Sequence, residues 1–326
     1  MALQPDGKIV VAGEGDCQLV GCLVLVGYTE DGSLDTSFGE GDGVVQTTFA
    51  QFGSLAFDVA TQSNGRIVAA GFRFRGGDAQ DDQLFAAARY LPDGRLDQSF
   101  SDDGRVSLDL GYGDDIARAV AVLPRGKILV AGQGTKNRGL TEDDFALVRL
   151  RRDGTRDATF SGDGVRLINF GARRHDIPYS LDVQQDGKIL VAGSSAKERE
   201  ADPRFAIARL DPNGSLDGSF GDGGLLRFTP GPDGGYAGAV VQHPDGRILV
   251  AGRRFVDGQH DPSDWVILRY RPDGSPDPSF GEGGMVITEF GTGPDRPRAM
   301  AVQTDGRIVV GGWIGVSLGL ARYLAV

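Results

Sequence analysis

The sequence predicts an all-β fold, a six-bladed β-propeller whose four-stranded antiparallel blades each take about 60 residues. Three observations lead to this prediction. The stretch Asp-Gly-Lys-Ile-Leu-Val-Ala-Gly recurs six times with small changes, each unit contains several short β-prone runs, and no segment has a sustained helical period. The six copies are residues 6–13, 64–71, 125–132, 186–193, 245–252 and 305–312.

Within one repeat, four β-prone runs are expected to form the four strands of a blade. In the stretch 165–220 they lie at 165–170, 180–184, 188–192 and 205–210. An Asp-Gly turn between the second and third runs favours a hairpin. The third and fourth runs are apolar almost without alternation, which is typical of strands buried on both faces. The second run is rich in small residues in most repeats, so we place it innermost, and the Gly-x-Val run outermost.

Other repeat architectures fit less well. The period is too long for WD40 repeats and for kelch repeats, and no Trp-Asp pair ends the units. A parallel β-helix conflicts with the Asp-Gly hairpin inside each unit.

We expect one domain over residues 1–326, because a single repeat is too small to bury its own apolar faces and must stack on its neighbours. The chain begins inside an innermost strand and ends after a third strand, so one blade is expected to be incomplete and to expose an edge. The repeats run approximately over 1–50, 51–110, 111–170, 171–230, 231–290 and 291–326.

Composition narrows the classes of partner. The 34 basic and 45 acidic side chains give a net charge of −11, and no basic stripe is present, so we expect no nucleic-acid partner. The sequence contains no run of about 18 apolar residues, so we expect no membrane insertion. Met1 leads directly into a repeat, without the pattern of a signal peptide. A protein or a carbohydrate remains as the expected partner.

Two cysteines, Cys17 and Cys22, flank a short loop in the first repeat. The spacing allows a local disulfide in an oxidising compartment, or two free thiols. A zinc site is not expected, because structural zinc takes four ligands and no further Cys or His is near in sequence.

The repeat resembles a known family, the delta-60 repeat β-propellers of bacteria. The matching residues are Val-Gln-Thr-Asp-Gly-Arg-Ile-Val-Val-Gly-Gly at 302–312 and Arg-Tyr-Arg-Pro-Asp-Gly-Ser-Pro-Asp-Pro-Ser-Phe-Gly at 269–281. The resemblance extends over essentially the whole chain. It implies a module of exported or cell-surface proteins, hence an extracellular location. It implies no catalytic residue.

A second repeated motif, Asp-Gly-x-x-Asp-x-x-Phe, has two interpretations. Its carboxylates are suitable ligands for calcium. Apart from calcium, no cofactor is expected. Alternatively, the first Asp favours a turn, and the second caps a one-turn helix that directs the Phe between blades. The copies start at Asp31, Asp93, Asp153, Asn213 and Asp273.

An arginine also recurs, at one position of each third strand except the first. A buried Arg needs a carboxylate, and the Asp residues of the motif have the same period, so a structural Arg–Asp lattice is favoured over substrate binding. The first repeat has Gly27 before Tyr28 and is expected to make a different contact. The recurring residues are Arg89, Arg149, Arg209, Arg269 and Arg322.

Residues that break the repeat are the candidates for function. Those entering the innermost strands are expected to surround the mouth of an axial channel, where Arg could clamp and Tyr could stack on a sugar or an acidic ligand. They are Asp115, Arg118, Arg174, His175, Asp176, Tyr179, Tyr236, Asp295, Arg296 and Arg298. Outer loops on the same face are expected to add Asp81, Asp82, Asp143, Asp144, His260, Asp264 and Trp265.

Three functions follow from these patterns. The leading hypothesis is a non-catalytic scaffold or recognition module that binds a ligand or partner on the variable-loop face. The second is a carbohydrate-active enzyme resembling a lyase, with His175 and Tyr179 as proton-transfer groups beside Arg118 and Arg298. The third is a calcium-stabilised adhesion domain.

Overall fold

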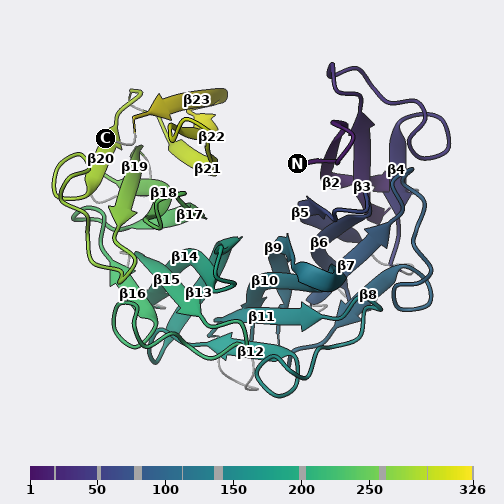
Figure 1. The fold of residues 1–326 in the computed structure, drawn as a ribbon, viewed down its shortest axis with the longest axis horizontal. Coiled ribbons are helices and arrows are strands. Elements are labelled where there is room, and N and C mark those ends of the chain that lie inside the picture. The colour runs from purple at the N-terminus through teal and green to yellow at the C-terminus, as the bar shows by residue number, and fades with distance from the viewer. Residues whose placement is uncertain are drawn as a thin grey trace. The chain divides into compact units, whose positions relative to one another are not determined.

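The computed structural model confirms the all-β prediction. It describes residues 1–17, 20–49, 53–76, 83–111, 113–135, 142–197, 203–256, 262–291 and 293–324. The described residues form six antiparallel sheets, each a meander of consecutive strands, and one short 3-10 turn at Pro124–Gly126. The protein is therefore a six-bladed β-propeller, and Figure 1 shows its blades in chain order from purple to yellow.

Five blades have four strands, and blade 6 has three among the described residues. Blades 1 to 3 contain β1 (Ala2–Leu3), β2 (Ile9–Cys17), β3 (Val20–Tyr28), β4 (Val44–Thr47), β5 (Ser54–Thr61), β6 (Ile67–Phe74), β7 (Gln83–Tyr90), β8 (Arg105–Leu108), β9 (Ile116–Val122), β10 (Ile128–Gly134), β11 (Asp144–Leu150) and β12 (Val165–Ile168). Blades 4 to 6 contain β13 (Arg174–Val183), β14 (Ile189–Lys197), β15 (Arg204–Leu210), β16 (Leu225–Phe228), β17 (Gly235–Gln242), β18 (Ile248–Phe255), β19 (Ser263–Tyr270), β20 (Met285–Thr288), β21 (Asp295–Val302), β22 (Ile308–Ile314) and β23 (Ser317–Tyr323).

The chain forms two compact units, residues 1–141 with 145–167, and residues 142–144 with 168–326. Within each unit, the first strands of successive blades contact one another, as β5 does β9 and β13 does β17. In blades 2 to 5 the middle strands are almost completely buried, as their continuous apolar runs predict, whereas β2 of blade 1 and β22 and β23 of blade 6 are partly exposed. The prediction of a single domain stays a prediction.

The Asp-Gly turns behave as predicted. At Gly187 φ is 84°, a conformation that glycine adopts without steric cost. The preceding carboxylate of Asp186 accepts a hydrogen bond from the Lys188 amide at 3.0 Å and so closes the turn. The corresponding glycines of the other repeats, including Gly7 and Gly306, also have positive φ.

A β-bulge interrupts the first strand of blades 2 to 6, and the sequence did not reveal it. In β13, Pro178 pairs with Gly193 and Ser180 pairs with Ala192, which leaves Tyr179 without a partner on β14. The extra residue bends the strand and redirects its own side chain. The five bulged residues are Phe57, Arg118, Tyr179, Gly238 and Arg298.

The bulge explains the final glycine of the Val-Ala-Gly motif. A Cβ at Gly193 would collide with the carbonyl oxygen of Ile177 and with Cα of Pro178, both backbone atoms that cannot move aside. The same collision recurs at Gly71, Gly132, Gly252 and Gly312. In blade 1 the described residues of β1 pair with Ile9 and Val10, and a Cβ at Gly13 would meet no described atom within 4 Å.

Cys17 and Cys22 form a disulfide between β2 and β3. Of the two states that the spacing allows, the structure has the disulfide. It closes the hairpin of blade 1 at the end where β2 and β3 meet.

We predict that Gly193→Ala destabilises the protein by about 1–3 kcal/mol or more, because overpacking against backbone atoms cannot be relieved by side-chain rotation. Gly13→Ala, at the same place in the motif, is the matched control and should leave the thermal denaturation midpoint nearly unchanged. Equal midpoints for the two variants would contradict the steric role of the bulge.

Candidate functional site

In blades 2 to 5 the recurrent Arg and Asp residues form the predicted lattice, whereas Arg322 of blade 6 is exposed. In blade 2, Nε of Arg89 lies 2.8 Å from Oδ2 of Asp97, and both side chains are almost completely buried. The hydroxyl and amide of Ser99 donate to the other oxygen, Oδ1, and the guanidinium of Arg89 lies over the Phe100 ring at 4.7 Å. The segment that holds the carboxylate is a turn and not the predicted one-turn helix. The same cluster recurs as Arg149–Asp157, Arg209–Asp217 and Arg269–Asp277.

The clusters of blades 2 and 4 also reach the next blade of their unit. Nη1 of Arg89 donates to the carbonyl oxygen of Arg152, and Nη1 of Arg209 donates to that of Pro272. The Phe100 ring packs against Gly154, where a Cβ would be only 3.1 Å from the ring. The Arg–Asp–Phe cluster therefore sets the contact between successive blades.

Blade 1 makes a different contact, as the sequence predicts. Gly27 replaces the Arg, and a Cβ on it would collide with the Phe38 ring, which takes the vacated place. Only Lys8 pairs with Asp35, at 2.8 Å, and the Lys8 side chain is 35% exposed. This ion pair is weaker than the buried pairs because water screens it.

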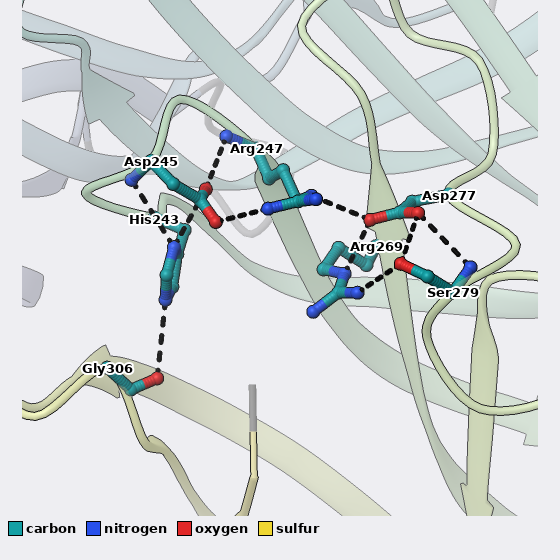
Figure 2. Close-up of polar contacts among 7 residues, drawn as sticks. All are labelled: His243, Asp245, Arg247, Arg269, Asp277, Ser279 and Gly306. Carbon is teal, nitrogen blue, oxygen red and sulfur yellow. Dashed lines mark hydrogen bonds and ion pairs between the residues drawn. The ribbon is translucent and has the colours of Figure 1, made fainter. Parts of the chain in front are cut away.

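Figure 2 shows the cluster of blade 5, which extends farther than the others. Arg247 bridges Asp245 and Asp277, and Asp277 also pairs with Arg269. His243 lies 2.8 Å from Asp245 through Nδ1 and 3.3 Å from the Gly306 carbonyl oxygen of blade 6 through Nε2. In blades 1 and 2 a glutamine makes this second contact, so His243 keeps a structural link between blades.

These contacts account for the carboxylates that the calcium interpretation used. The second Asp of every motif is neutralised by a Lys or Arg, and the first accepts a backbone amide of its own turn. In the part of the chain that the structure describes, no group of three or more His, Cys, Asp or Glu could hold a metal ion. A calcium requirement stays a prediction.

The bulged positions contain the residues that differ most between blades. Arg118, Tyr179 and Arg298, all predicted site residues, occupy three of the five bulges. Each follows three residues after one of the predicted acids, Asp115, Asp176 and Asp295. The backbone feature is constant and its side chain varies, which is the arrangement expected of a surface adapted to a ligand.

The structure brings Tyr179 and Tyr236 together. Their rings meet edge to face at a centroid distance of 6.3 Å, although they come from different blades. Tyr236 also contacts the Phe255 ring at 5.3 Å, and the guanidinium of Arg253 lies 4.9 Å from both the Tyr236 and Phe255 centroids. Burial and the nearby Tyr179 raise the pKa of Tyr236, so its hydroxyl stays protonated and can donate.

Two hydrogen bonds hold these two blades in register beneath the tyrosines. The Val240 amide donates to Oγ of Ser180 at 3.0 Å, and the Gln242 amide donates to Oδ2 of Asp182 at 2.7 Å. Sequence reasoning missed Arg253 and Phe255, because they lie in an ordinary second strand and only their departure from the other copies marks them.

The remaining basic candidates lie on the first strands of blades 4 and 6. Nδ1 of His175 is 3.1 Å from Oδ2 of Asp143. Arg174 is buried, Arg296 is half-buried and Arg298 is exposed. None of them has a described contact with Tyr179 or Tyr236.

The predicted acids lie inside the protein. Asp115 and Asp176 are completely buried, and each accepts a backbone amide of the segment that precedes the blade: Leu110 at 2.7 Å and Phe170 at 2.7 Å. Asp295 accepts the amides of Phe290 and Gly315. These carboxylates close the connections between blades.

Burial perturbs their titration. It raises the pKa of Asp115 to about 7, with a further contribution from the charge of Asp109, and the hydrogen bond from Leu110 opposes this only in part. Burial likewise raises the pKa of Asp176 to about 6. Their charged forms are therefore unfavourable in the fold.

Two grooves lie beside the fourth strands of the first unit, and the second is also lined by Leu110, whose amide donates to Asp115. One, of about 510 Å³, is lined by β4 and by residues 94–96, and the other, of about 290 Å³, by β12 and Arg156. Neither contains a residue that the sequence predicted to bind a ligand.

The expected outer-loop residues are placed differently from the prediction. Trp265 lies within β19 and is fully buried, with Nε1 donating to the Trp313 carbonyl oxygen at 3.2 Å, so its expected place on a loop is wrong. Asp264 is also in β19 and pairs with Arg254. Asp144 begins β11 and accepts the Asn169 amide group. Asp81, Asp82 and His260 lie outside the described residues.

The family of the chain follows from its repeats. A family model described as "Domain of unknown function (DUF5122) beta-propeller" matches residues 4–38, 62–100, 124–160, 184–220, 243–280 and 303–326, one segment for each blade. The chain belongs to this family. No curated protein sequence matches it.

Solved structures with the same fold include proteins of different activities. A protein of unknown function from Dyadobacter fermentans has a TM-score of 0.58 and 13% identity, over 98% of this chain and 92% of that one. An ulvan lyase bound to -[GlcA(1-4)Rha3S]- has a TM-score of 0.56 and 10% identity, over 98% and 78%. A puromycin hydrolase has a TM-score of 0.52 and 16% identity, over 98% and 44%. Identities this low show the fold alone.

No helix among the described residues is both long and apolar enough to span a membrane.

We predict that Asp277→Asn destabilises the protein far more than Asp35→Asn does. The first change leaves Arg269 buried without its carboxylate, at about 3–5 kcal/mol, whereas the second loses only the half-exposed Lys8 pair, at about 1 kcal/mol or less. Chemical denaturation of both variants at neutral pH checks this, and equal midpoints would contradict the lattice.

We predict that the Asp115 and Asp176 carboxyls make the protein less stable as the pH rises. Folding raises the pKa values of these two carboxyls. Between about pH 4 and pH 7 they therefore lose their protons in the unfolded chain and keep them in the folded protein, which lowers the free energy of unfolding as the pH rises. Across this pH range, the free energy of unfolding of Asp115→Asn should rise by on the order of 3–4 kcal/mol relative to that of the wild type. Melting temperatures from pH 4 to pH 8 measure this difference. Asp186→Asn, at an exposed turn, is the control, and parallel curves for all three proteins would refute the prediction.

Proposed function

We propose that the protein is a non-catalytic recognition module that binds an acidic carbohydrate through the aromatic cluster of blades 4 and 5, formed by Tyr179, Tyr236, Arg253 and Phe255. The observation that supports this most is the constant bulge with a variable residue. A fixed backbone that presents different side chains in each blade is suited to recognition, because binding sites need rigid positioning of a few polar groups.

The chemistry of the cluster favours a sugar with a carboxylate or sulfate. Tyrosine rings present apolar faces to the ring carbons of a sugar, and their hydroxyls provide hydrogen bonds to its hydroxyl groups. Arg253 supplies positive charge beside these rings in a chain of net charge −11, and an Arg fork matches an anionic group. The ulvan lyase has the same fold and is bound to a saccharide, which supports a carbohydrate ligand by analogy only.

We further propose that the protein acts outside the cell. The resemblance to delta-60 repeat propellers of exported proteins supports this location. The Cys17–Cys22 disulfide supports it independently, since disulfides persist in oxidising compartments.

A second candidate is a lyase acting on an acidic polysaccharide. The observation that favours it is the contact of His175 with Asp143, because a carboxylate that orients an imidazole is the usual arrangement of a general base. In this alternative, Tyr179 on the same strand would serve as the second proton-transfer group.

The expected result is that the wild type binds an oligogalacturonate and binds its fully methyl-esterified form at least about tenfold more weakly, because esterification removes the charge that Arg253 recognises. Tyr236→Ala and Arg253→Ala should each lower the affinity by about tenfold. Arg95→Ala, an exposed arginine on a turn of blade 2, is the matched control. Isothermal titration calorimetry at several salt concentrations measures these affinities.

Incubating the protein with the same oligogalacturonate distinguishes the two candidate functions. If an unsaturated product accumulates with time in the wild type and not in His175→Ala, the protein is a lyase and not a non-catalytic recognition module. Binding that is unaffected by Tyr236→Ala and Arg253→Ala would exclude this cluster as the site.

A further inference from the structure

A second aromatic cluster lies on blade 2, at Phe57, Phe72 and Phe74. The Phe57 and Phe72 rings are 6.0 Å apart, and the Phe72 and Phe74 rings meet edge to face at 5.3 Å. Phe57 is 47% exposed and Phe74 is 37% exposed. Outside blade 6 and the first three residues, the other exposed large apolar side chain among the described residues is Leu34. Both exposed rings pack on Phe72, which is almost completely buried, and a contiguous exposed apolar patch marks an interaction site, whereas single exposed apolar residues are ordinary.

Arginines border this cluster. The guanidinium of Arg118, the bulged residue of blade 3, lies 5.2 Å from the Phe57 ring centroid. Its Nε and Nη2 both donate to Oε1 of Gln133, at 3.1 and 2.8 Å, and Gln133 is only 7% exposed. Gln133 therefore acts as a positioning residue that holds the charge of Arg118 over the aromatic ring.

Positive charge is also concentrated at the Phe74 end. Arg73 donates to the carbonyl oxygen of Phe74 at 2.9 Å and makes no ion pair within the described ranges. Burial and the charge of Arg75 lower the pKa of Arg73. Arg75 itself is paired with Asp109.

The cluster is held rigidly by the backbone. The amide of Val120 on β9 donates to Oδ2 of Asp58 on β5 at 2.9 Å, directly behind Phe57 and Arg118. The other oxygen of Asp58 accepts the Val59 amide at 2.8 Å. The carboxylate beside Phe57 is thus committed to backbone groups, and the two bulged side chains keep a fixed separation. A preorganised surface loses less conformational entropy on binding.

The chemistry of this surface differs from that of blades 4 and 5. Phenylalanine rings offer no hydrogen-bonding group, so sugar hydroxyls packed on them would lose their hydrogen bonds to water without replacement. An apolar side chain loses nothing there, and arginines beside it suit carboxylates. Aromatic residues and Arg are also the residues enriched at the energetic centres of protein interfaces.

We infer that Phe57, Phe74, Arg73 and Arg118 form a docking surface for a segment of a partner protein in which acidic and aromatic side chains alternate. This surface is separate from the proposed carbohydrate cluster and does not depend on it. Two surfaces of different chemistry would let the module link a carbohydrate to a protein.

The test uses the full chain and an unlabelled tetrapeptide that alternates aspartate with phenylalanine, with blocked ends. One comparison peptide has asparagine for aspartate, and another has serine for phenylalanine. By isothermal titration calorimetry, the wild type should bind the acidic, aromatic peptide at least about tenfold more tightly than either comparison peptide. Phe57→Ser and Arg118→Ala should each lower the affinity for this peptide by about tenfold.

Leu34→Ser and Arg95→Ala are the controls, because they change a similarly exposed apolar residue and an exposed arginine elsewhere in the first unit. Phe74→Ser replaces Phe57→Ser if the latter lowers the melting temperature. The inference is overturned if the wild type does not bind the peptide, if the control variants lose as much affinity as the test variants, or if Phe57→Ser abolishes oligogalacturonate binding instead.

Discussion

The buried Arg–Asp pair is the interaction on which the stacking of blades depends. In blade 4, Arg209 satisfies the carboxylate of Asp217 with Nε and reaches the next blade with Nη1. A buried ion pair adds little net stability, because desolvation offsets most of the attraction. Its effect is specificity: a guanidinium offers donors in fixed directions, so one side chain fixes both its own turn and the neighbour that the turn must meet. The ion pair is repeated in every blade from the second to the fifth, and in blades 2 and 4 the same guanidinium fixes the contact with the next blade of the unit.

That fixed geometry makes variation possible elsewhere. At the opposite end of blades 2 to 6, the bulge and the facing glycine form a constant backbone feature. Because the extra residue belongs to no strand pair, its side chain is not required for the sheet, and phenylalanine, arginine, tyrosine and glycine all occupy the position. The scaffold and the variable surface thus use different parts of one repeat, and substitutions at the bulge need not disturb the Arg–Asp clusters.

The sequence predicted the parts of the structure that are both local and periodic. The Asp-Gly turn needs only adjacent residues, and the Arg–Asp pairing follows from two residues with the same period, so both were predicted. Tyr179 and Tyr236 were recognised because they interrupt the pattern. Phe72 and Arg253 were not, since each resembles an ordinary strand residue. Phe72 is distinguished only by its contact with the bulged Phe57, and Arg253 only by its contact with the Tyr236 ring. Trp265 was misplaced because the polar residues before it suggested a loop, although the strand had already begun.

The buried acids Asp115 and Asp176 show why the position of a residue in the repeat did not reveal what its side chain does. Asp115 and Asp176 stand three residues before a bulge, where a polar side chain suggests a ligand contact, yet they accept backbone amides. Blade 2 closes the corresponding connection with Ser54, whose uncharged hydroxyl donates to the Thr47 carbonyl oxygen at 3.5 Å and accepts the Leu23 amide of β3 at 3.3 Å. A neutral group is therefore sufficient for this purpose. Using a carboxylate instead adds a desolvation cost above the pKa of each acid and none below it. The segments that lead into Arg118 and Tyr179 are consequently held more firmly in mildly acidic than in alkaline solution.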